Sequence, residues 1–191
     1  MKDDSLYAFM YRGMLTKTAV RLASRQMKSE ADSIGAVATR LPFDLLEEQI
    51  VQRAKEMAVV FSAITAFENS VRAFVEKRLL EEIGDDWWTK CVPEKRRQKA
   101  ESRRDEENKI RWHAKRGSSL LEYTDIEDLS AIFTTNQDVF LPIVQSIDWV
   151  KNIFKTVELS RNIIMHSGYL EAEDVERLGM SMRDWLAQIG A

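Results

Sequence analysis

The sequence predicts an all-α fold, a helical bundle with an additional N-terminal helical segment. The 191 residues include only seven glycines and three prolines, and 31% of them are charged, a composition that favours helix over sheet. The longest apolar patterns recur at intervals of three and four residues, which is the spacing of one helical face. Apolar residues make up 45% of the chain, enough for one hydrophobic core at the size of a single domain.

The N-terminal segment carries a loosely helical pattern with a Met-rich face over residues 5–27. Such a face docks either on the body of the same chain or on a second copy, and we favour a core-covering helix because methionines mostly fill gaps in cores. The pattern weakens over residues 29–40, and Pro42 forces the residue before it out of helical geometry. We therefore expect residues 1–41 to form an N-terminal helical extension and residues 42–191 to form the main helical domain.

A central helix is expected over residues 45–83, ended by Gly84. Its apolar stripe at helical spacing consists of Val60, Ile64, Phe67, Val71, Phe74, Val75 and Leu79. Glu68 lies beside this stripe, and two interpretations of it stand. It pairs with Arg72, four residues later on the same helix, or it is partly buried and reaches across the bundle to a cation, for which Arg161 is the candidate.

A basic segment follows, with ten Lys or Arg residues between positions 95 and 116 against five acidic residues between 94 and 107. It has too few aliphatic residues to bury itself, so a solvated helix or loop is the favoured interpretation. The alternative is an arm that contacts RNA phosphates, with Trp112 and His113 as stacking groups. Its cationic side chains would be Arg96, Arg97, Lys99, Arg103, Arg104, Lys109, Arg111, Lys115 and Arg116.

Three further helices complete the predicted bundle. Thr124 and Glu127 have the spacing of a capping box, which predicts a helix start at Asp125. The next helix is expected to begin near Pro142 and to run to the segment that holds the candidate site. The last helix, over residues 173–189, has Val175, Leu178, Met182, Trp185, Leu186 and Ile189 on one face and closes the bundle.

The candidate site is a polar trio, Arg161, Asn162 and His166, near the end of a core-facing helix that Gly168 should stop. On an ideal helix Asn162 and His166 are four residues apart and share a face, whereas Arg161 lies round to the side. The three side chains converge only if the helix end distorts at Ser167 and Gly168 or if a second subunit supplies its own copy. This geometry favours a homodimer.

The chemistry open to the trio is limited by what accompanies it. With one cysteine and two histidines in the chain, a zinc site is not expected, and neither a phosphate-binding glycine loop nor a recognisable serine triad is present. We expect no metal and no cofactor. The trio suits metal-free phosphodiester cleavage. The histidine can move protons near neutral pH, the arginine can neutralise a phosphate, and the amide can form hydrogen bonds.

These residues resemble a known family. Arg161-Asn162-x-x-x-His166 is similar to the Arg-polar-x-x-x-His signature of the HEPN superfamily, all-α domains that are often metal-independent endoribonucleases. Four further segments, residues 66–74, 84–88, 123–129 and 174–178, resemble the Swt-type HEPN branch, and the resemblance covers roughly residues 42–189.

The resemblance implies a HEPN-like bundle that pairs as a homodimer, with two copies of Arg161 and His166 in a shared cleft. In such enzymes the 2′-hydroxyl of RNA attacks the adjacent phosphorus and leaves a cyclic phosphate and a free 5′-hydroxyl. By position, His166 would act as acid or base, Arg161 would hold the scissile phosphate and Asn162 would orient one of them. Glu68 and Arg72 stand where the family often has polar residues that support the site.

Two functional hypotheses follow from different classes. The first is an endoribonuclease acting as a toxin or anti-phage defence effector, together with an antitoxin or defence-system partner protein. The second is a catalytically inactive HEPN module that binds RNA or a protein partner. The trio of Arg161, Asn162 and His166 favours the first, since a purely structural helix end has no need of this combination.

The composition also indicates a compartment. The single Cys91 excludes an internal disulfide and suggests a reducing environment. The acidic N-terminus differs from a targeting signal, and no apolar run approaches the length of a membrane span, so we expect a cytoplasmic protein with no membrane partner. The net charge of −3 argues against a protein devoted to coating nucleic acid.

Overall fold

The computed structural model describes residues 33–190, and every regular element within that range is a helix. The chain divides into two compact units, residues 1–52 and 53–191. In the described part of the first unit, residues 33–38 are helical and the 3-10 helix η1 spans Phe43–Leu45. The helix expected over residues 5–27 lies outside the described residues, and the boundary expected after residue 41 stays a prediction.

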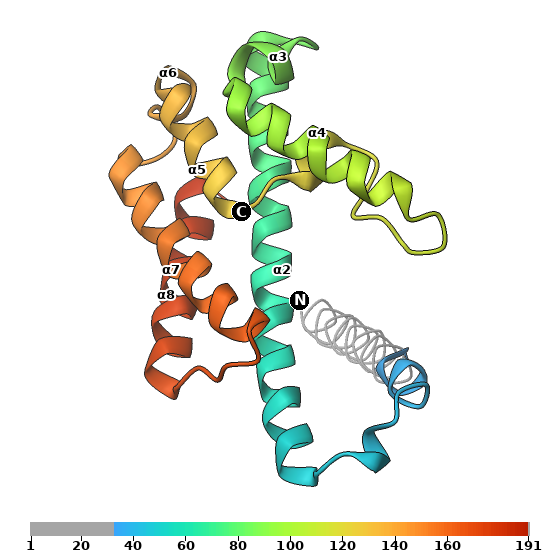
Figure 1. Ribbon diagram of the computed structural model, residues 1–191. Coiled ribbons are helices and arrows are strands. Elements are labelled where there is room, and N and C mark those ends of the chain that lie inside the picture. Colours follow the sequence, from blue (N-terminus) through green and yellow to red (C-terminus); the bar gives the residue numbers. More distant parts are fainter. Residues whose placement is uncertain (1–32, 191) are drawn as a thin grey trace, which may run out of the picture. The chain divides into compact units, whose positions relative to one another are not determined.

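The second unit is a helical bundle built along α2 (Glu48–Ile83), which begins at the end of the first unit. In Figure 1, α5 to α8 lie along one side of α2, and α4 extends away on the other side. The remaining elements are α3 (Trp87–Cys91), α4 (Glu94–Lys109), η2 (Leu120–Tyr123), α5 (Ile126–Thr135), α6 (Gln137–Phe140), α7 (Ile147–Met165) and α8 (Ala172–Ile189).

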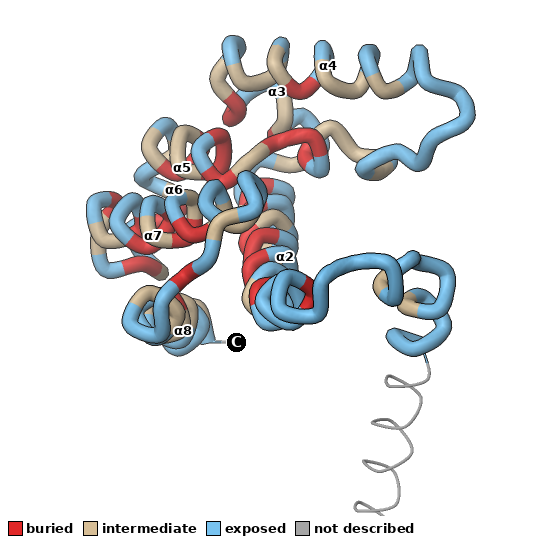
Figure 2. The backbone as a smooth tube through the Cα atoms, turned by 60° about the horizontal axis from the view of Figure 1, so that its bottom comes forward, coloured by how far each residue is buried: buried red, intermediate tan, exposed pale blue. Residues whose placement is uncertain are grey.

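The core of the bundle is an aromatic cluster around Trp185 of α8, which is completely buried. Its indole lies 5.4–6.2 Å, between ring centroids, from Phe67 and Phe74 of α2, Phe133 of α5 and Phe154 of α7. Figure 2 shows the buried positions gathered where these helices face one another. The apolar stripes predicted for the central and last helices therefore meet in one core.

The predicted helix boundaries are partly correct. The central helix ends at Ile83 as expected, and Gly84 follows it with a φ of +84°. The helix expected from Pro142 begins instead at Ile147, because the Ser146 hydroxyl accepts a hydrogen bond from the Trp149 N–H at 3.1 Å and caps it there.

The start of α5 is also capped differently from the prediction. Asp125, rather than Thr124, is the N-cap residue, and its partner in the capping box is Asp128. Each of these two aspartates accepts a hydrogen bond from the backbone N–H of the other, at 2.9 and 3.1 Å. The Thr124 hydroxyl donates to the Leu121 carbonyl instead.

Among the described helices, α2 alone is long and apolar enough to cross a membrane by length and composition. One such helix is weak evidence for a span, because the core helix of a soluble protein meets the same test. Val71, Val75 and Leu79 of α2 are completely buried in the bundle, and Glu68 and Arg72 interrupt its apolar sequence with an ion pair. These contacts identify α2 as the central helix of the bundle.

Candidate catalytic site

The centre of the candidate site is Glu68 of α2, a carboxylate that is only 6% exposed. Its Oε2 accepts a hydrogen bond from Nη2 of Arg72 at 3.1 Å. Its Oε1 lies 3.4 Å from Nε of Arg161 on α7. Both interpretations offered by the sequence are therefore realised at once: Glu68 pairs along its own helix and also reaches across the bundle.

Further hydrogen bonds fix the Arg72 side chain in this cluster. Its Nη1 donates to Oδ1 of Asn69, and its Nη2 donates to the Thr124 carbonyl, each at 2.9 Å. The two arginines Arg72 and Arg161 thus share the single carboxylate of Glu68, which leaves the three groups with an excess of one positive charge. Arg161 is the more open of the two, with 34% of its side chain exposed against 14% for Arg72.

The end of α7 is regular up to His166, which is the C-cap residue. The His166 N–H donates to the Asn162 carbonyl at 3.1 Å, as in a continuing helix. Ser167 then takes a left-handed conformation with a φ of +62°. The N–H groups of Ser167 and Gly168 close the helix on the carbonyls of Ile164 and Ile163, the hydrogen-bond pattern of a Schellman motif.

Gly168 has a steric role at this helix end. A Cβ atom at this position would lie 2.6 Å from Cγ2 of Ile163 and 2.8 Å from the Ile163 carbonyl oxygen. The glycine is thus required by the close approach of the chain to α7, whereas the left-handed position belongs to Ser167.

This helix end keeps Asn162 and His166 on a different face from Arg161. The left-handed residue comes after His166, so the distortion that would bring the trio together within one chain does not occur. Asn162 and His166 are both exposed, and Arg161 is directed to Glu68. In the described part of the chain the His166 side chain makes no hydrogen bond or ion pair, so its imidazole is open to a ligand or to another subunit.

An unpartnered apolar surface surrounds the exposed pair on α7. Leu159 and Ile163 are 52% and 42% exposed. With Asn162 and His166 they occupy positions i, i+3, i+4 and i+7 of the helix, which place all four on one face. We call these four residues the α7 face.

The connection between α7 and α8 is anchored to α2 by contacts that the sequence analysis did not identify. The Tyr169 hydroxyl donates to Oε2 of Glu56 at 2.8 Å, and the Leu170 N–H donates to the sulfur of Met57 at 3.3 Å. The hydrogen bond and the negative charge of Glu56 raise the pKa of Tyr169. The chain following His166 is therefore tied to a second helix, which limits how far the imidazole can move.

The basic segment forms α4 and the loop after it, and one face of α4 is bound to the start of α5. Arg96, Lys99 and Arg103 lie three and four residues apart on this face. Lys99 and Arg103 each reach the carboxylates of both Asp125 and Asp128, and Arg96 reaches that of Asp128, at 2.9–3.3 Å. Asp128 is buried, with only 1% of the residue exposed. We call these five residues the α4–α5 clamp.

The clamp changes the interpretation of the predicted RNA-binding arm. Arg96 and Arg103 are held by carboxylates inside the domain, so we remove them, together with Lys99, from the set of candidate phosphate contacts. The signal for the clamp was present in the sequence, as three cations at helical spacing and two acids three residues apart, yet nothing local indicated that the two groups would meet.

The other predicted RNA-binding residues lie further round α4 and in the loop that follows it. Arg104 lies 3.4 Å from its neighbour Asp105, and Nε of Arg116 lies 2.7 Å from Oε1 of Glu107. The remaining candidates have no carboxylate partner within residues 33–190, namely Arg97, Lys109, Arg111 and Lys115.

The clamp perturbs the acid–base behaviour of Asp125. Burial by itself raises the pKa of this carboxyl, but hydrogen bonds from Arg103 and Lys99 outweigh burial and hold its pKa well below the ordinary value of 3.8. Asp125 is therefore a charged structural group at neutral pH and is no candidate for a catalytic acid.

Two hollows lie near these elements. The first, of about 500 Å³, lies between α2 and the segment leading into η2, and Asn69, Arg72 and Arg116 contribute to its wall. It therefore links the Glu68 cluster to the base of the loop after α4. Because Glu76 and Glu122 also line it, this hollow does not have the uniformly positive wall of a phosphate site.

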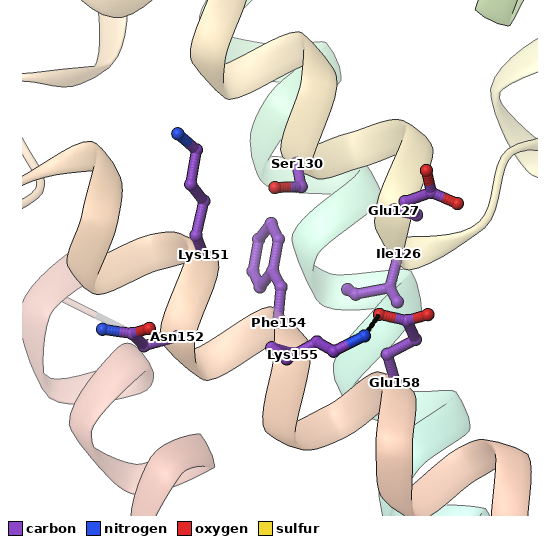
Figure 3. Close-up of a pocket in the computed structure, with 8 residues that line it drawn as sticks. All are labelled: Ile126, Glu127, Ser130, Lys151, Asn152, Phe154, Lys155 and Glu158. Atoms are coloured by element: carbon purple, nitrogen blue, oxygen red, sulfur yellow. Dashed lines mark hydrogen bonds and ion pairs between the residues drawn. The ribbon is translucent and has the colours of Figure 1, made fainter.

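The second hollow, of about 420 Å³, lies between α5 and α7. Figure 3 shows Phe154 between the two helices, with Lys151 and Lys155 extending from α7. Each lysine has a carboxylate nearby, Glu158 at 3.0 Å from Lys155 and Asp148 at 3.6 Å from Lys151. None of the predicted site residues lines this hollow, so we do not assign the candidate site to it.

Comparison with known proteins gives one match. Residues 62–190 match the family model described as Swt1-like HEPN. The match begins within α2 before Glu68 and includes α7 and its trio. Comparisons with curated proteins and with solved structures give no match.

Proposed function

The chain belongs to the Swt1-like HEPN family, and from this premise we propose that it is a metal-independent endoribonuclease. The observation that carries the proposal is the ion pair between Glu68 and Arg161, 3.4 Å across the bundle, where Arg161 lies on the same helix as His166, which is exposed and makes no side-chain hydrogen bond or ion pair within the described residues. A guanidinium held in place by a buried carboxylate is preorganised to stabilise negative charge on a phosphate, and an exposed imidazole is available for proton transfer.

The proposed reaction uses only side chains, supplied by two copies of this site. The 2′-hydroxyl oxygen of the RNA attacks the adjacent phosphorus while one imidazole takes its proton. The bond from phosphorus to the 5′ oxygen breaks, and a second imidazole donates the proton that this oxygen needs to leave as a hydroxyl. A 2′,3′-cyclic phosphate and a 5′-hydroxyl result, with Arg161 neutralising charge on the phosphate and Asn162 orienting it.

We further propose that the active form is a homodimer joined through the α7 face. One chain carries one His166, and its Arg161 lies on another side of α7, so a single chain supplies half of the required groups. Leu159 and Ile163 offer exposed apolar surface around Asn162 and His166, which supports a contact between two copies at this face. A twofold axis there would set the two imidazoles opposite each other.

A substitution designed to disrupt the dimer tests this arrangement. Leu159→Glu adds a charge to the α7 face without changing a catalytic group, so it is expected to give a monomer in analytical ultracentrifugation, with unchanged helical circular dichroism and lost RNA cleavage. A monomeric Leu159→Glu protein that cleaves as fast as the wild type would refute the shared site.

The activity itself is tested by incubating the purified full chain with single-stranded RNA in EDTA. Wild-type protein is expected to cleave and to leave cyclic phosphate ends, whereas His166→Ala is expected to be inactive with unchanged circular dichroism. Asn152→Ala is the matched control, because Asn152 is an exposed polar residue on the same helix and away from the trio. Its activity should equal that of the wild type.

The alternative function is that of an inactive HEPN module that binds RNA or a protein partner. Absence of cleavage by wild-type protein across many RNAs, together with retained RNA binding, would favour it. As a biological setting we propose a cytoplasmic toxin or anti-phage defence effector restrained by an antitoxin or defence-system protein. Expression in a bacterial host tests this setting: wild type should arrest growth and His166→Ala should not.

A further inference from the structure

The loop between α4 and η2 presents an aromatic side chain to solvent. Trp112 is 85% exposed, whereas Trp185 is completely buried and Trp87 is only 7% exposed. Exposure of so large an apolar ring is unfavourable in water and contributes nothing to the core. Trp112 therefore has the properties of a residue that binds something outside the domain.

The charge around Trp112 is uniformly positive in sequence. From Asn108 to Leu121 the chain contains four cationic residues and no acidic residue. One of the four, Arg116, is paired with Glu107. The other three have no carboxylate partner within the described range, and they are Lys109, Arg111 and Lys115.

The base of the loop is closed by hydrogen bonds. Both the backbone N–H and Nε of Arg116 contact the Glu107 carboxylate, at 3.1 and 2.7 Å, and Nζ of Lys115 donates to Oδ1 of Asn108. At the tip, the His113 ring stands edge-on to the indole of Trp112 with centroids 5.5 Å apart. A loop closed in this way presents its ring at lower entropic cost than a free segment would.

We propose that the loop of residues 109–116 is a binding site for single-stranded RNA. An unpaired base stacks on the indole of Trp112, and the phosphates on either side contact Lys109, Arg111 and Lys115. This inference rests on the proposed function for its choice of RNA, and it deepens that function by naming unpaired RNA as the substrate class. A duplex cannot bind in the same way, because its bases are already stacked on one another.

An anionic membrane surface is the competing partner for a cationic loop with a tryptophan. Among residues 109–116, Ile110 is the only other large apolar side chain that is exposed, at 47%. A lipid interface needs a larger apolar face than this, since interfacial binding scales with buried apolar area. One flat ring among three cations that have no carboxylate partner in the described range is closer to what a base and its phosphates require.

The test uses the full chain carrying His166→Ala, so that bound RNA stays intact. Affinity is measured by fluorescence anisotropy for a labelled short single-stranded RNA, for the blunt duplex of the same sequence and for vesicles containing an anionic phospholipid. In this His166→Ala background, Trp112→Ala is expected to lower the affinity for single-stranded RNA roughly 5- to 150-fold. Trp112→Phe should restore most of the affinity because the stacking ring is kept.

Met180→Ala is the matched control, because Met180 is a large apolar residue on α8 that is 53% exposed. It should leave binding unchanged, and all variants should keep the circular dichroism of the parent. An unchanged affinity of Trp112→Ala for single-stranded RNA, equal binding of the duplex, or Trp112-dependent binding to vesicles alone would overturn the inference.

The outcomes separate this inference from the proposed function. Cleavage that requires His166, with binding insensitive to Trp112→Ala, would sustain the ribonuclease and eliminate the loop site. Binding that requires Trp112, with no cleavage by the wild-type protein, would sustain the loop site and eliminate the ribonuclease.

Discussion

Oε1 of Glu68 lies 3.4 Å from Nε of Arg161, and this ion pair joins the central helix to the helix that carries the candidate site. The other oxygen of Glu68 is bound by Arg72, so one largely buried carboxylate holds two guanidinium groups. Within the described residues Oε1 accepts no well-aligned hydrogen bond. Its contact with Arg161 is therefore chiefly electrostatic, and it depends on the negative charge of Glu68 more than on the shape of the side chain.

Glu68→Gln keeps the shape and removes the charge. Two arginines are then left side by side without a counter-ion, so we expect the free energy of unfolding to fall by about 1–3 kcal/mol in urea denaturation. RNA cleavage should also fall, since Arg161 loses the group that orients it.

Glu81→Gln provides the control for Glu68→Gln. Glu81 pairs with Arg78 on the same helix but is 47% exposed, so its loss should change stability by no more than about 0.5 kcal/mol. Equal effects of the two substitutions would show that burial adds nothing to the pairing of Glu68 with Arg161.

The end of α7 predicts opposite effects for two adjacent substitutions. Ser167→Gly removes the steric cost of a non-glycine residue in the left-handed conformation. We expect this gain to exceed the entropy cost of a new glycine, so that the variant is more stable by about 0.5 kcal/mol. Gly168→Ala brings a Cβ against the Ile163 carbonyl and should destabilise by about 1–3 kcal/mol. Melting temperatures of the two variants check this, and a shift of both in the same direction would contradict the described helix end.

The α4–α5 clamp predicts different consequences for two neighbouring arginines. Arg103 donates to Asp125 at 2.9 Å and to the Tyr123 carbonyl at 2.8 Å, so Arg103→Ala should cost about 1–2 kcal/mol. Arg104→Ala removes a side chain that is 40% exposed and pairs, among the described residues, only with its neighbour Asp105, so its stability should stay within about 0.5 kcal/mol of the wild type. Urea denaturation of both variants makes the comparison, and an equal loss from Arg104→Ala would argue against the clamp.

Acid should weaken the clamp through Asp125. Its pKa in the folded protein lies below the ordinary value of 3.8, so its contribution to stability is complete above about pH 4 and is lost as the pH falls towards the folded pKa. Stability measured by urea denaturation between pH 7 and pH 3 should therefore decline less steeply in Asp125→Asn than in the wild type. Asp138→Asn, at an exposed position on α6, should follow the wild-type curve.

Trp185 is expected to be the most sensitive core position. Trp185→Ala removes the ring that contacts Phe67, Phe133 and Phe154, and should cost about 3–5 kcal/mol. Trp185→Phe should cost less, roughly 1–2 kcal/mol, because the indole N–H has no hydrogen-bond partner among the described residues. Thermal unfolding of both variants gives the comparison, and equal losses would contradict the assigned role of the ring.

The sequence predicted the helical class and the central helix because these depend on local periodicity. The stripe that includes Val71, Val75 and Leu79 is buried as the spacing requires. Helix starts were less predictable, since a cap depends on one hydrogen bond. The start of α7 was expected near Pro142, whereas the hydrogen bond from the Trp149 N–H to the Ser146 hydroxyl places it at Ile147.

Contacts between distant segments were predicted only where a buried charge demanded one. A partner for Glu68 on another helix is predictable because an apolar neighbourhood penalises a lone carboxylate. The partners of Asp128 are not predictable in the same way, because a position three residues after Asp125 in a helix start gives no indication of burial. The roles assigned to Arg161, Asn162 and His166 stay predictions until cleavage is measured.

The way α4 is attached has a consequence for how this family member can vary. Ala100 is the only buried residue of α4. The helix is therefore held to the domain by the ion pairs of the clamp and contributes almost nothing to the packing of the core. The segment after Arg103, which includes the end of α4 and the following loop, can therefore change in length or composition while the aromatic core remains intact. Under the proposed function, RNA preference can diversify in this appendage without a loss of stability in the bundle that supports it.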